Sequence, residues 1–179
     1  MKILVIGNIA SGKSTLSNSI LGLYPEFCSI SIDEMRKLHS DGSELGEKYA
    51  KQVFIDCISS DETCQIIEFS GIGELAALTF EKIKSDSNIL IIYLRVPEEI
   101  INLRLQNRCW DTPFPLPLEN LPTAIKHTSS EFSRGVIESH LKMCPQSVLL
   151  SLKNETNADI QVITELCRLY IQNIMSDNL

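Results

Sequence analysis

The sequence lacks the features that mark membrane proteins and proteins that bind nucleic acid over a broad charged face. None of its apolar stretches approaches the roughly 20 residues that span a bilayer. No run of Lys and Arg exceeds two residues, and the 179-residue chain carries a net charge of −7. These absences argue against membrane insertion and against broad electrostatic binding to nucleic acid, although one nucleotide or strand end could enter a local basic pocket.

The sequence also shows no signal-peptide pattern and none of the Cys or Cys/His spacings that are typical of redox motifs or zinc sites. The N-terminal residues hold one Lys followed by strand-forming residues, which is not a signal-peptide pattern. No cysteine pair has C-x-x-C spacing, and no Cys/His cluster has the spacing of a zinc site. We therefore expect a cytoplasmic protein whose six cysteines are reduced thiols, namely Cys28, Cys57, Cys64, Cys109, Cys144 and Cys167.

What the sequence does contain is a glycine-rich segment that matches the phosphate-binding pattern of Gly, four residues, then Gly-Lys-Ser/Thr. An apolar strand is predicted before it at residues 2–6, and a helix after it, from about Lys13. The segment consists of Gly7, Asn8, Ile9, Ala10, Ser11, Gly12, Lys13, Ser14 and Thr15. This context predicts a strand, a phosphate-binding loop and a helix in succession.

Each residue type in this loop has a physical role in binding a nucleotide. Gly7 and Gly12 allow the backbone to approach a ligand closely, so that successive N–H groups form an anion nest. The N-terminal end of the helix adds its positive dipole. Lys13 would reach the β- and γ-phosphates of ATP, and the Ser14 hydroxyl would coordinate Mg²⁺. Two other interpretations are a turn that only links strand to helix, and a loop that binds nucleotide without catalysis.

The remaining pattern alternates strands with helices and predicts one α/β domain over residues 1–179. Predicted strands cover residues 2–6, 27–32, 65–69, 88–94 and 146–152, the fourth being the most hydrophobic and expected at the centre. Predicted helices follow at 34–59 with a break at 41–43, and at 74–84, 96–108, 122–143 and 157–175. This order predicts a three-layer α/β/α sandwich around a five-stranded parallel sheet. The Pro-rich stretch at about 109–122 is a lid-like segment or an ordinary packed loop.

Ligands of such sheets bind beyond the carboxyl ends of the strands, where several polar residues are predicted. Asp33 would be a catalytic base or hold a metal-bound water, or would cap the next helix. Arg36 would clamp an anionic substrate or be solvated. Glu68 would bind Mg²⁺ through water, orient substrate, or pair with a nearby cation. Ser70 and Gly71 would let substrate approach the backbone, or form a strained turn.

Two arginines spaced four residues apart, Arg104 and Arg108, project from one face of the helix at 96–108. Their mutual repulsion is relieved if ATP phosphates lie beside them, and surface ion pairs with Glu99 or Asp111 are the alternative. Arg134 would join them if the Pro-rich loop folds over. The three histidines, His39, His127 and His140, show no pairing with an acid and a nucleophile and are expected to lie on the surface or on helices without chemical roles.

Together these residues resemble the small P-loop kinases, particularly adenylate kinase and related nucleoside monophosphate kinases. The resemblance rests on residues 7–15, on Asp33 and Arg36 in an Asp-x-x-Arg pattern, and on the Val96-Pro97-Glu98-Glu99 helix start that precedes Arg104 and Arg108. It covers residues 1–108 and implies ATP–Mg²⁺ phosphotransfer, strand order 2-3-1-4-5 and a lid that excludes water.

The acceptor side departs from that family. After the third strand the family usually carries Asp-Gly-Phe-Pro-Arg, whereas residues 68–73 here read Glu-Phe-Ser-Gly-Ile-Gly and supply no Arg. Related P-loop kinases that phosphorylate hydroxyls place an Asp after the second strand, as Asp33 is placed. The sequence therefore predicts an ATP- and Mg²⁺-dependent kinase acting on a nucleotide, a nucleoside or another hydroxyl metabolite.

Two interpretations from other classes compete with the kinase. One is a nucleotide-binding regulatory domain without turnover. A GTPase switch ranks lower, because we find neither Asp-x-x-Gly nor Asn/Thr-Lys-x-Asp in a suitable place.

Overall fold

The computed structural model describes residues 1–58, 64–106 and 118–177. Its centre is a five-stranded sheet with the order β2-β3-β1-β4-β5, in which all neighbouring strands are parallel. This confirms the predicted α/β fold and strand order. The strands are β1 (Lys2–Gly7), β2 (Cys28–Ser31), β3 (Gln65–Phe69), β4 (Ile89–Arg95) and β5 (Val148–Lys153). The middle position belongs to β1 and not to the most hydrophobic strand, β4, which lies between β1 and β5.

The helices of the described residues follow the predicted order with two changes. They are α1 (Lys13–Leu23), α2 (Ile32–His39), α3 (Glu44–Cys57), α4 (Gly73–Ile83), α5 (Glu98–Gln106), α6 (Leu121–Ser133), α7 (Val136–Met143) and α8 (Asn157–Asp177), with a short 3₁₀ turn η1 (Leu118–Asn120). The helix predicted at 122–143 is two helices, because Gly135 between them adopts a positive φ of 86°. Helix α2 begins at Ile32, so Ser31 takes the N-cap position and Asp33 lies within the first turn.

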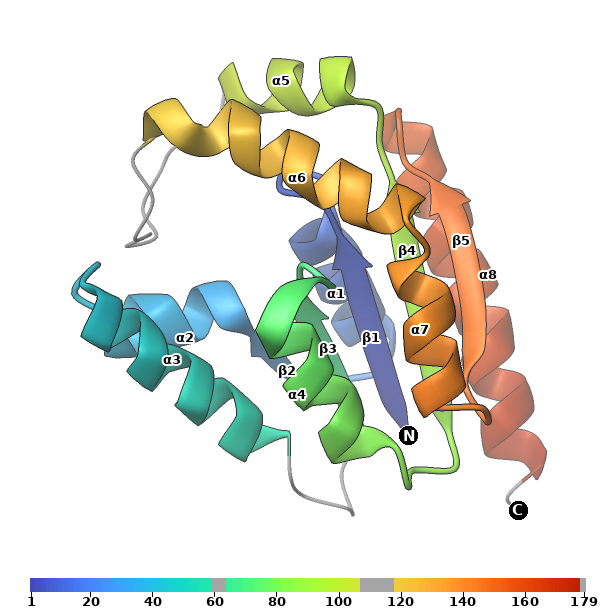
Figure 1. Cartoon of the computed structure of the whole chain (residues 1–179). Helices are drawn as coiled ribbons and strands as arrows, with labels where there is room; N and C mark the ends of the chain where they lie inside the picture. The colour runs from blue at the N-terminus through green and yellow to red at the C-terminus, as the bar shows by residue number, and fades with distance from the viewer. Residues whose placement is uncertain (59–63, 107–117, 178–179) are drawn as a thin grey trace.

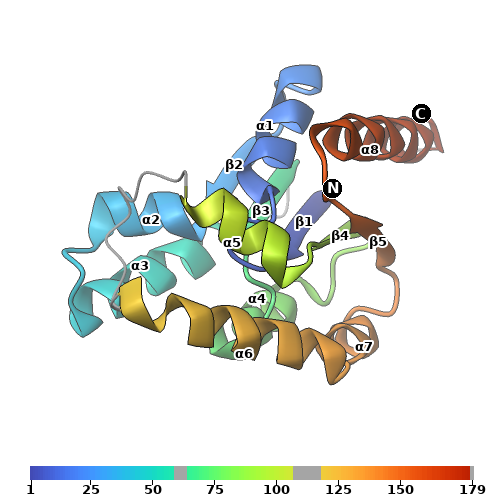
Figure 2. The ribbon, with the colours of Figure 1, turned by 90° about the horizontal axis from the view of Figure 1, so that it is seen from above.

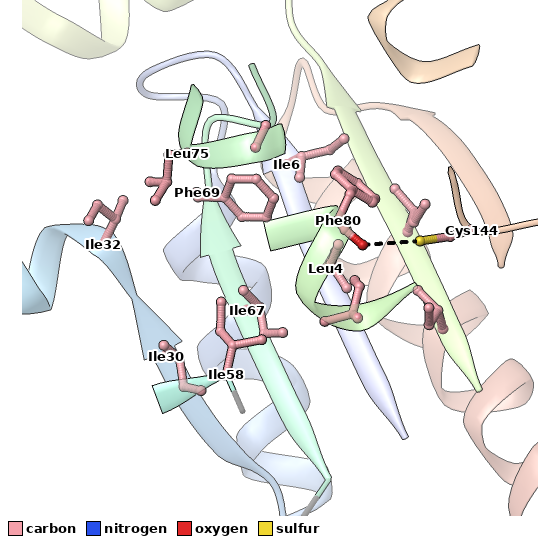
Figure 3. Packing of buried hydrophobic residues seen from close by; sticks show 14 of the residues in the cluster. Leu4, Ile6, Ile30, Ile32, Ile58, Ile67, Phe69, Leu75, Phe80 and Cys144 are labelled. Atoms are coloured by element: carbon pink, nitrogen blue, oxygen red, sulfur yellow. Dashed lines mark hydrogen bonds between the residues drawn. The ribbon is translucent and has the colours of Figure 1, made fainter. Parts of the chain in front are cut away.

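The sheet is covered on both faces, and side chains of each strand alternate between them. On one face, Leu4 and Ile6 of β1 pack with Phe69 of β3 and with α3, α4 and α7 (Figure 3). On the other face, Ile3 and Val5 pack against α1 and α8. Figure 1 shows the same layers, with α4 and α7 in front of the sheet and α1 and α8 behind it.

The cysteines of the described residues are free thiols, and two of them belong to these cores. Cys144 donates to the Phe80 carbonyl at 3.7 Å, as drawn in Figure 3. Burial raises the pKa of Cys144 to about 11 and that of Cys167 to about 12. Both thiols are therefore protonated at neutral pH and serve as small apolar packing groups.

Two helices, α5 and α6, lie beyond the carboxyl ends of the strands, where the phosphate-binding motif also lies (Figure 1). Seen from above, α5 passes over the end of β1 while α2 and α3 lie to one side (Figure 2). The predicted lid segment falls largely on residues 107–117, outside the described residues, and its last residues form η1 and the start of α6. Within the described part of the chain, each helix is too short or too polar to cross a membrane.

Candidate functional site

The turn between β1 and α1 has the geometry of an anion-binding loop. Gly7 and Gly12 both adopt positive φ values, of 150° and 92°, and α1 begins directly after Gly12. A Cβ atom on Gly12 would lie 2.4 Å from Nδ2 of Asn154, so no larger residue fits without displacing that amide. Ala10 also adopts a positive φ of 54°, which is uncommon for a residue with a side chain. The loop is held in one strained conformation, with the N-terminal end of α1 at its side.

Lys13 and Ser14 connect this loop to the end of β3. The Lys13 ammonium donates to the carbonyl oxygens of Asn8 at 2.9 Å and of Gly7 at 3.3 Å. The Ser14 hydroxyl donates to a Glu68 carboxylate oxygen at 2.7 Å. Burial raises the pKa of Glu68, while the charge of Lys13 and the Ser14 hydrogen bond act in the opposite direction. A serine hydroxyl and a buried carboxylate are the oxygen donors that Mg²⁺ prefers.

A cavity of about 400 Å³, which we call the loop cavity, opens over this turn. Its walls come from the phosphate loop, from α2, β3 and α5, and from the segment between β5 and α8. Lining residues are Ile9, Ala10, Ser11, Gly12, Lys13, Ser14, Thr15, Asp33, Glu68, Arg104, Asn154, Thr156, Asn157 and Ile160. The residues at 9–15 that were predicted to bind a nucleotide thus line one space with Asp33, Glu68 and Arg104.

A second cavity of about 270 Å³, which we call the apolar cavity, lies on the α6 side of the same loop. Its lining residues are Gly7, Asn8, Ile9, Lys13, Ile32, Asp33, Arg36, Glu68, Phe69, Ser70, Ile72, Leu75, Leu121, Ala124, His127 and Thr128. Gly7 and Asn8, predicted to bind the nucleotide, line this cavity instead. The two cavities share Ile9, Lys13, Asp33 and Glu68, so a ligand in each would meet at the same charged groups.

Asp33 and Arg36 lie one turn apart on α2 and contact each other. An Arg36 nitrogen donates to Asp33 Oδ1 at 2.9 Å. The same guanidinium donates to both carboxylate oxygens of Glu47 on α3, at 2.8 and 2.7 Å. Its side chain is only 13% exposed, so the predicted alternative of a solvated Arg36 is wrong. Because Ser31 occupies the N-cap position, Asp33 is not the cap of the helix either.

Arg104 of α5 lies at the loop cavity, as the sequence predicts. It donates to the Ala10 carbonyl at 3.1 Å and to the Asn154 carbonyl at 2.9 Å. These two bonds join α5, the phosphate loop and the segment after β5, and they place a cation at the cavity wall. Arg108, predicted to act with it, lies outside the described residues. Arg134 pairs instead with Glu131 at 3.0 Å on the exposed end of α6.

The turn after β3 contains two predicted substrate-binding residues, Ser70 and Gly71, and only Ser70 lines one of the two cavities. Ser70 lines the apolar cavity, and its carbonyl accepts a hydrogen bond from Gly7 at 3.2 Å. Gly71 is buried, and a Cβ atom there would lie 2.8 Å from the Cβ of Ile6. The backbone of Gly71 therefore packs against the core, which favours the turn interpretation over direct contact with substrate.

His140 lies in a helix, α7, as predicted for the histidines, and its side chain is buried. His140 is 5% exposed and stacks on Phe80 with ring centroids 4.0 Å apart. Its Nε2 donates to the Gly71 carbonyl at 2.9 Å, which requires the tautomer with the proton on Nε2. Burial lowers the pKa of His140, so the ring is neutral at pH 7. His140 is a core residue that supports the turn after β3, and His127 lines the apolar cavity.

Two connections between the phosphate loop and distant segments are not predictable from the sequence, because only tertiary packing forms them. Asn154, 142 positions after Gly12, donates through Nδ2 to the Ser11 carbonyl at 2.7 Å. Asn8 donates through Nδ2 to the Ile125 carbonyl at 2.9 Å and to the Ser129 hydroxyl at 3.2 Å. Through Asn8, the phosphate loop holds α6 across the apolar cavity. No motif in the sequence marks α6 or Asn154 as parts of the site.

Comparison with known proteins identifies the fold. No protein-family model and no curated protein matches the chain. Among solved structures, a shikimate kinase from Acinetobacter baumannii in complex with shikimate shares 18% identity, with 96% of this chain and 93% of that chain covered and a TM-score of 0.65. A putative kinase from Chloroflexus aurantiacus shares 15% identity, with 96% of each chain covered and a TM-score of 0.62.

A sugar kinase from Janibacter sp. HTCC2649 shares 13% identity, with 96% of this chain and 94% of that chain covered and a TM-score of 0.56. The similarity spans nearly the whole chain in each case. Together with the strand order, it shows that this protein has the α/β fold of the small P-loop kinases.

Proposed function

We propose that the protein transfers the γ-phosphoryl group of ATP to a hydroxyl group of a small molecule, with Mg²⁺. The observation that carries this proposal is the meeting of two cavities at Lys13, Asp33 and Glu68. Phosphoryl transfer needs a donor and an acceptor positioned on opposite sides of the transferred group, with cations near the developing charge and a group to orient the nucleophile. The loop cavity supplies the donor side and the apolar cavity the acceptor side.

On the donor side, the backbone amides of the loop and the N-terminal end of α1 would bind the phosphates. Lys13 and Arg104 would neutralise charge that develops on the transferred group and on the leaving phosphate. The hydrogen bonds of Arg104 to the carbonyls of Ala10 and Asn154, which hold it at the wall of the loop cavity, support this role. Arg108, which lies outside the described residues, stays a sequence-based proposal for a second cation.

Ser14 and Glu68 would hold Mg²⁺, with phosphate oxygens and water completing its coordination. Their oxygens lie 2.7 Å apart, and the buried position of Glu68 lets the carboxylate interact with a cation through little intervening water. A Mg²⁺ ion held there would supply positive charge that stabilises the negative charge developing on the transferred group.

Asp33 would accept the proton of the acceptor hydroxyl. The hydroxyl oxygen forms a bond to the γ-phosphorus, the bond from that phosphorus to the oxygen bridging to the β-phosphate breaks, and ADP leaves. The proton passes to the Asp33 carboxylate, which later releases it to water. Arg36 orients this carboxylate through the 2.9 Å contact from its neighbouring turn.

A label-transfer assay tests this proposal. The protein is incubated with γ-labelled ATP, Mg²⁺ and a broad panel of hydroxyl compounds and nucleotides, and we expect label to appear on an acceptor. Asp33→Asn should then reduce turnover by about 10²- to 10⁴-fold while the affinity for ATP is unchanged. Glu34→Gln, at the exposed neighbouring acid, is the matched control and should retain full turnover.

Two results would contradict the proposal. If ATP binds but no acceptor in the panel receives label, a regulatory nucleotide-binding domain is the better explanation. If Asp33→Asn keeps full turnover, Asp33 is not the proton acceptor.

A further inference from the structure

The apolar cavity restricts the chemistry of the acceptor beyond the presence of a hydroxyl group. Much of its wall is hydrocarbon, contributed by Ile9, Ile32, Phe69, Ile72, Leu75, Leu121 and Ala124. Its polar lining residues include Asp33, Glu68 and Lys13, which also line the loop cavity. A ligand would gain affinity by burying an apolar body against this wall and by directing one polar group toward Asp33.

Among the described residues, the Lys, Arg, Asp and Glu side chains that line the cavity carry equal numbers of positive and negative charges. Besides His127, its charged lining residues within the described part of the chain are two cations and two carboxylates, namely Lys13, Arg36, Asp33 and Glu68. Lys13 contacts the carbonyls of the phosphate loop and serves the donor side. Arg36 is then the cation that an acidic acceptor would have to use.

Arg36 is already neutralised by carboxylates of the protein. Glu47 accepts two hydrogen bonds from it in a fork-like pair, and Asp33 accepts a third. Glu47 is itself 7% exposed, so separating the pair would leave a buried carboxylate with only Lys51, whose ammonium lies 3.4 Å from it, as a cationic partner. An acceptor phosphate or carboxylate would have to compete with Glu47 and would also face the negative charges of Asp33 and Glu68.

We propose that the acceptor of this kinase is an uncharged hydroxyl compound with an apolar body, and not a phosphate monoester or a carboxylic acid. This proposal rests on the kinase activity proposed above. The turn after β3 agrees with it, because residues 68–73 carry no cation that could bind an acceptor phosphate.

Three probes that share a 4-hydroxycyclohexyl body and carry a neutral or an anionic substituent test this proposal: 4-hydroxycyclohexanecarboxamide, 4-hydroxycyclohexanecarboxylate and 4-hydroxycyclohexyl phosphate. Binding to the wild-type protein is measured by calorimetric titration, with and without a non-hydrolysable ATP analogue and Mg²⁺. We expect the carboxamide to bind at least about tenfold more tightly than either anion, because an uncompensated buried charge is costly. Binding of the probes does not require turnover, so this readout is independent of the kinase assay.

The variant Glu47→Gln removes the negative charge of Glu47 and leaves Arg36 with less compensation. It should raise the affinity for the carboxylate probe relative to the carboxamide by about tenfold, whereas Glu44→Gln, at an exposed acid of the same helix, should leave the ratio unchanged. Equal or tighter binding of an anionic probe to the wild type would overturn the proposal, and so would failure of the carboxamide to bind. Label transfer to any acceptor in the earlier assay would then still support the kinase itself.

Discussion

The loop cavity and the apolar cavity share a boundary but are built in different ways. Half of the loop cavity comes from seven consecutive residues, 9–15, whose backbone conformation and charge suit a polyphosphate. The apolar cavity takes its walls from the phosphate loop and from β1, α2, β3, α4 and α6, and its described Lys, Arg, Asp and Glu side chains balance in charge. The proposed donor side is therefore built around one local motif, whereas the proposed acceptor side depends mainly on distant segments. Such an assembly can change its substrate without changing the phosphate loop.

After Asp33→Asn, the largest loss of turnover is expected at Glu68, which also lies where the two cavities meet. Glu68→Gln removes a carboxylate that would hold Mg²⁺ with Ser14, and turnover should fall on the order of 100-fold. The Mg²⁺ concentration for half-maximal rate should rise in parallel. Steady-state kinetics over a Mg²⁺ series measures both quantities. Glu74→Gln, at an exposed acid at the start of α4, is the control, and an unchanged Mg²⁺ dependence in Glu68→Gln would exclude Glu68 from the metal site.

A bulky side chain in α6 should weaken acceptor binding in the apolar cavity without changing nucleotide binding in the loop cavity. Ala124 lines the apolar cavity only, so Ala124→Trp should fill that space and raise the KM for the acceptor by about 10- to 100-fold. The affinity for the ATP analogue should stay within twofold of the wild-type value. Ala77→Trp, at an exposed site on α4, controls for the added indole. Loss of ATP affinity with unchanged acceptor KM would reverse the assignment of the cavities.

Replacing Arg104 should weaken nucleotide binding in the loop cavity without changing acceptor binding, and its effect should be smaller than the two effects above. Arg104→Ala removes a cation and two hydrogen bonds to Ala10 and Asn154, and we expect about tenfold weaker binding of the ATP analogue. Binding of the carboxamide probe should be unaffected. Arg95→Ala, at an exposed arginine outside both cavities, provides the comparison in the same titration. Equal ATP affinity in both variants would remove Arg104 from the donor site.

The smallest effect, a change in the free energy of unfolding, is expected at His140, which bonds to the turn after β3. His140→Phe keeps the ring stack on Phe80 but loses the hydrogen bond to Gly71, which should lower the free energy of unfolding by about 1 kcal/mol. The native state holds His140 with a lowered pKa, so the unfolded chain binds the proton more readily. Wild-type stability should therefore decrease as the pH falls below about 6.5, and this part of the decrease should vanish in the variant.

Urea unfolding at pH 7.5 and pH 5.5 measures this difference. His39→Phe, which keeps an aromatic ring beside Tyr49, is the control and should retain the His140 contribution to the pH dependence. The same pH dependence in wild type and His140→Phe would show that His140 does not carry it.

The sequence predicts the parts of the site that depend on neighbouring residues. The Gly-x₄-Gly-Lys-Ser motif and the contact between Asp33 and Arg36 three residues on follow from local spacing. The strand order, which the structure confirms, follows from the resemblance to the small P-loop kinases. Arg104 is also correctly placed beside the loop, because helix periodicity and the resemblance to P-loop kinases both pointed there.

What the sequence does not predict depends on packing between distant elements. The pairing of Arg36 with Glu47 arises only when α3 folds back along α2, and no pattern links the two residues. The contacts of Asn8 with α6 and of Asn154 with the loop join segments more than 100 residues apart. The apolar pattern predicts one helix over residues 122–143, although Gly135 within it could indicate the helix end that the structure shows.

The central claim is that the turn between β1 and α1 binds a polyphosphate, and Lys13 tests it most directly. Calorimetric titration of the non-hydrolysable ATP analogue with Mg²⁺ compares the wild type, Lys13→Ala and the exposed control Lys48→Ala. We predict a loss of affinity of about 10- to 100-fold for Lys13→Ala and none for Lys48→Ala. Unchanged affinity in Lys13→Ala would contradict the assignment of the loop cavity as the nucleotide site.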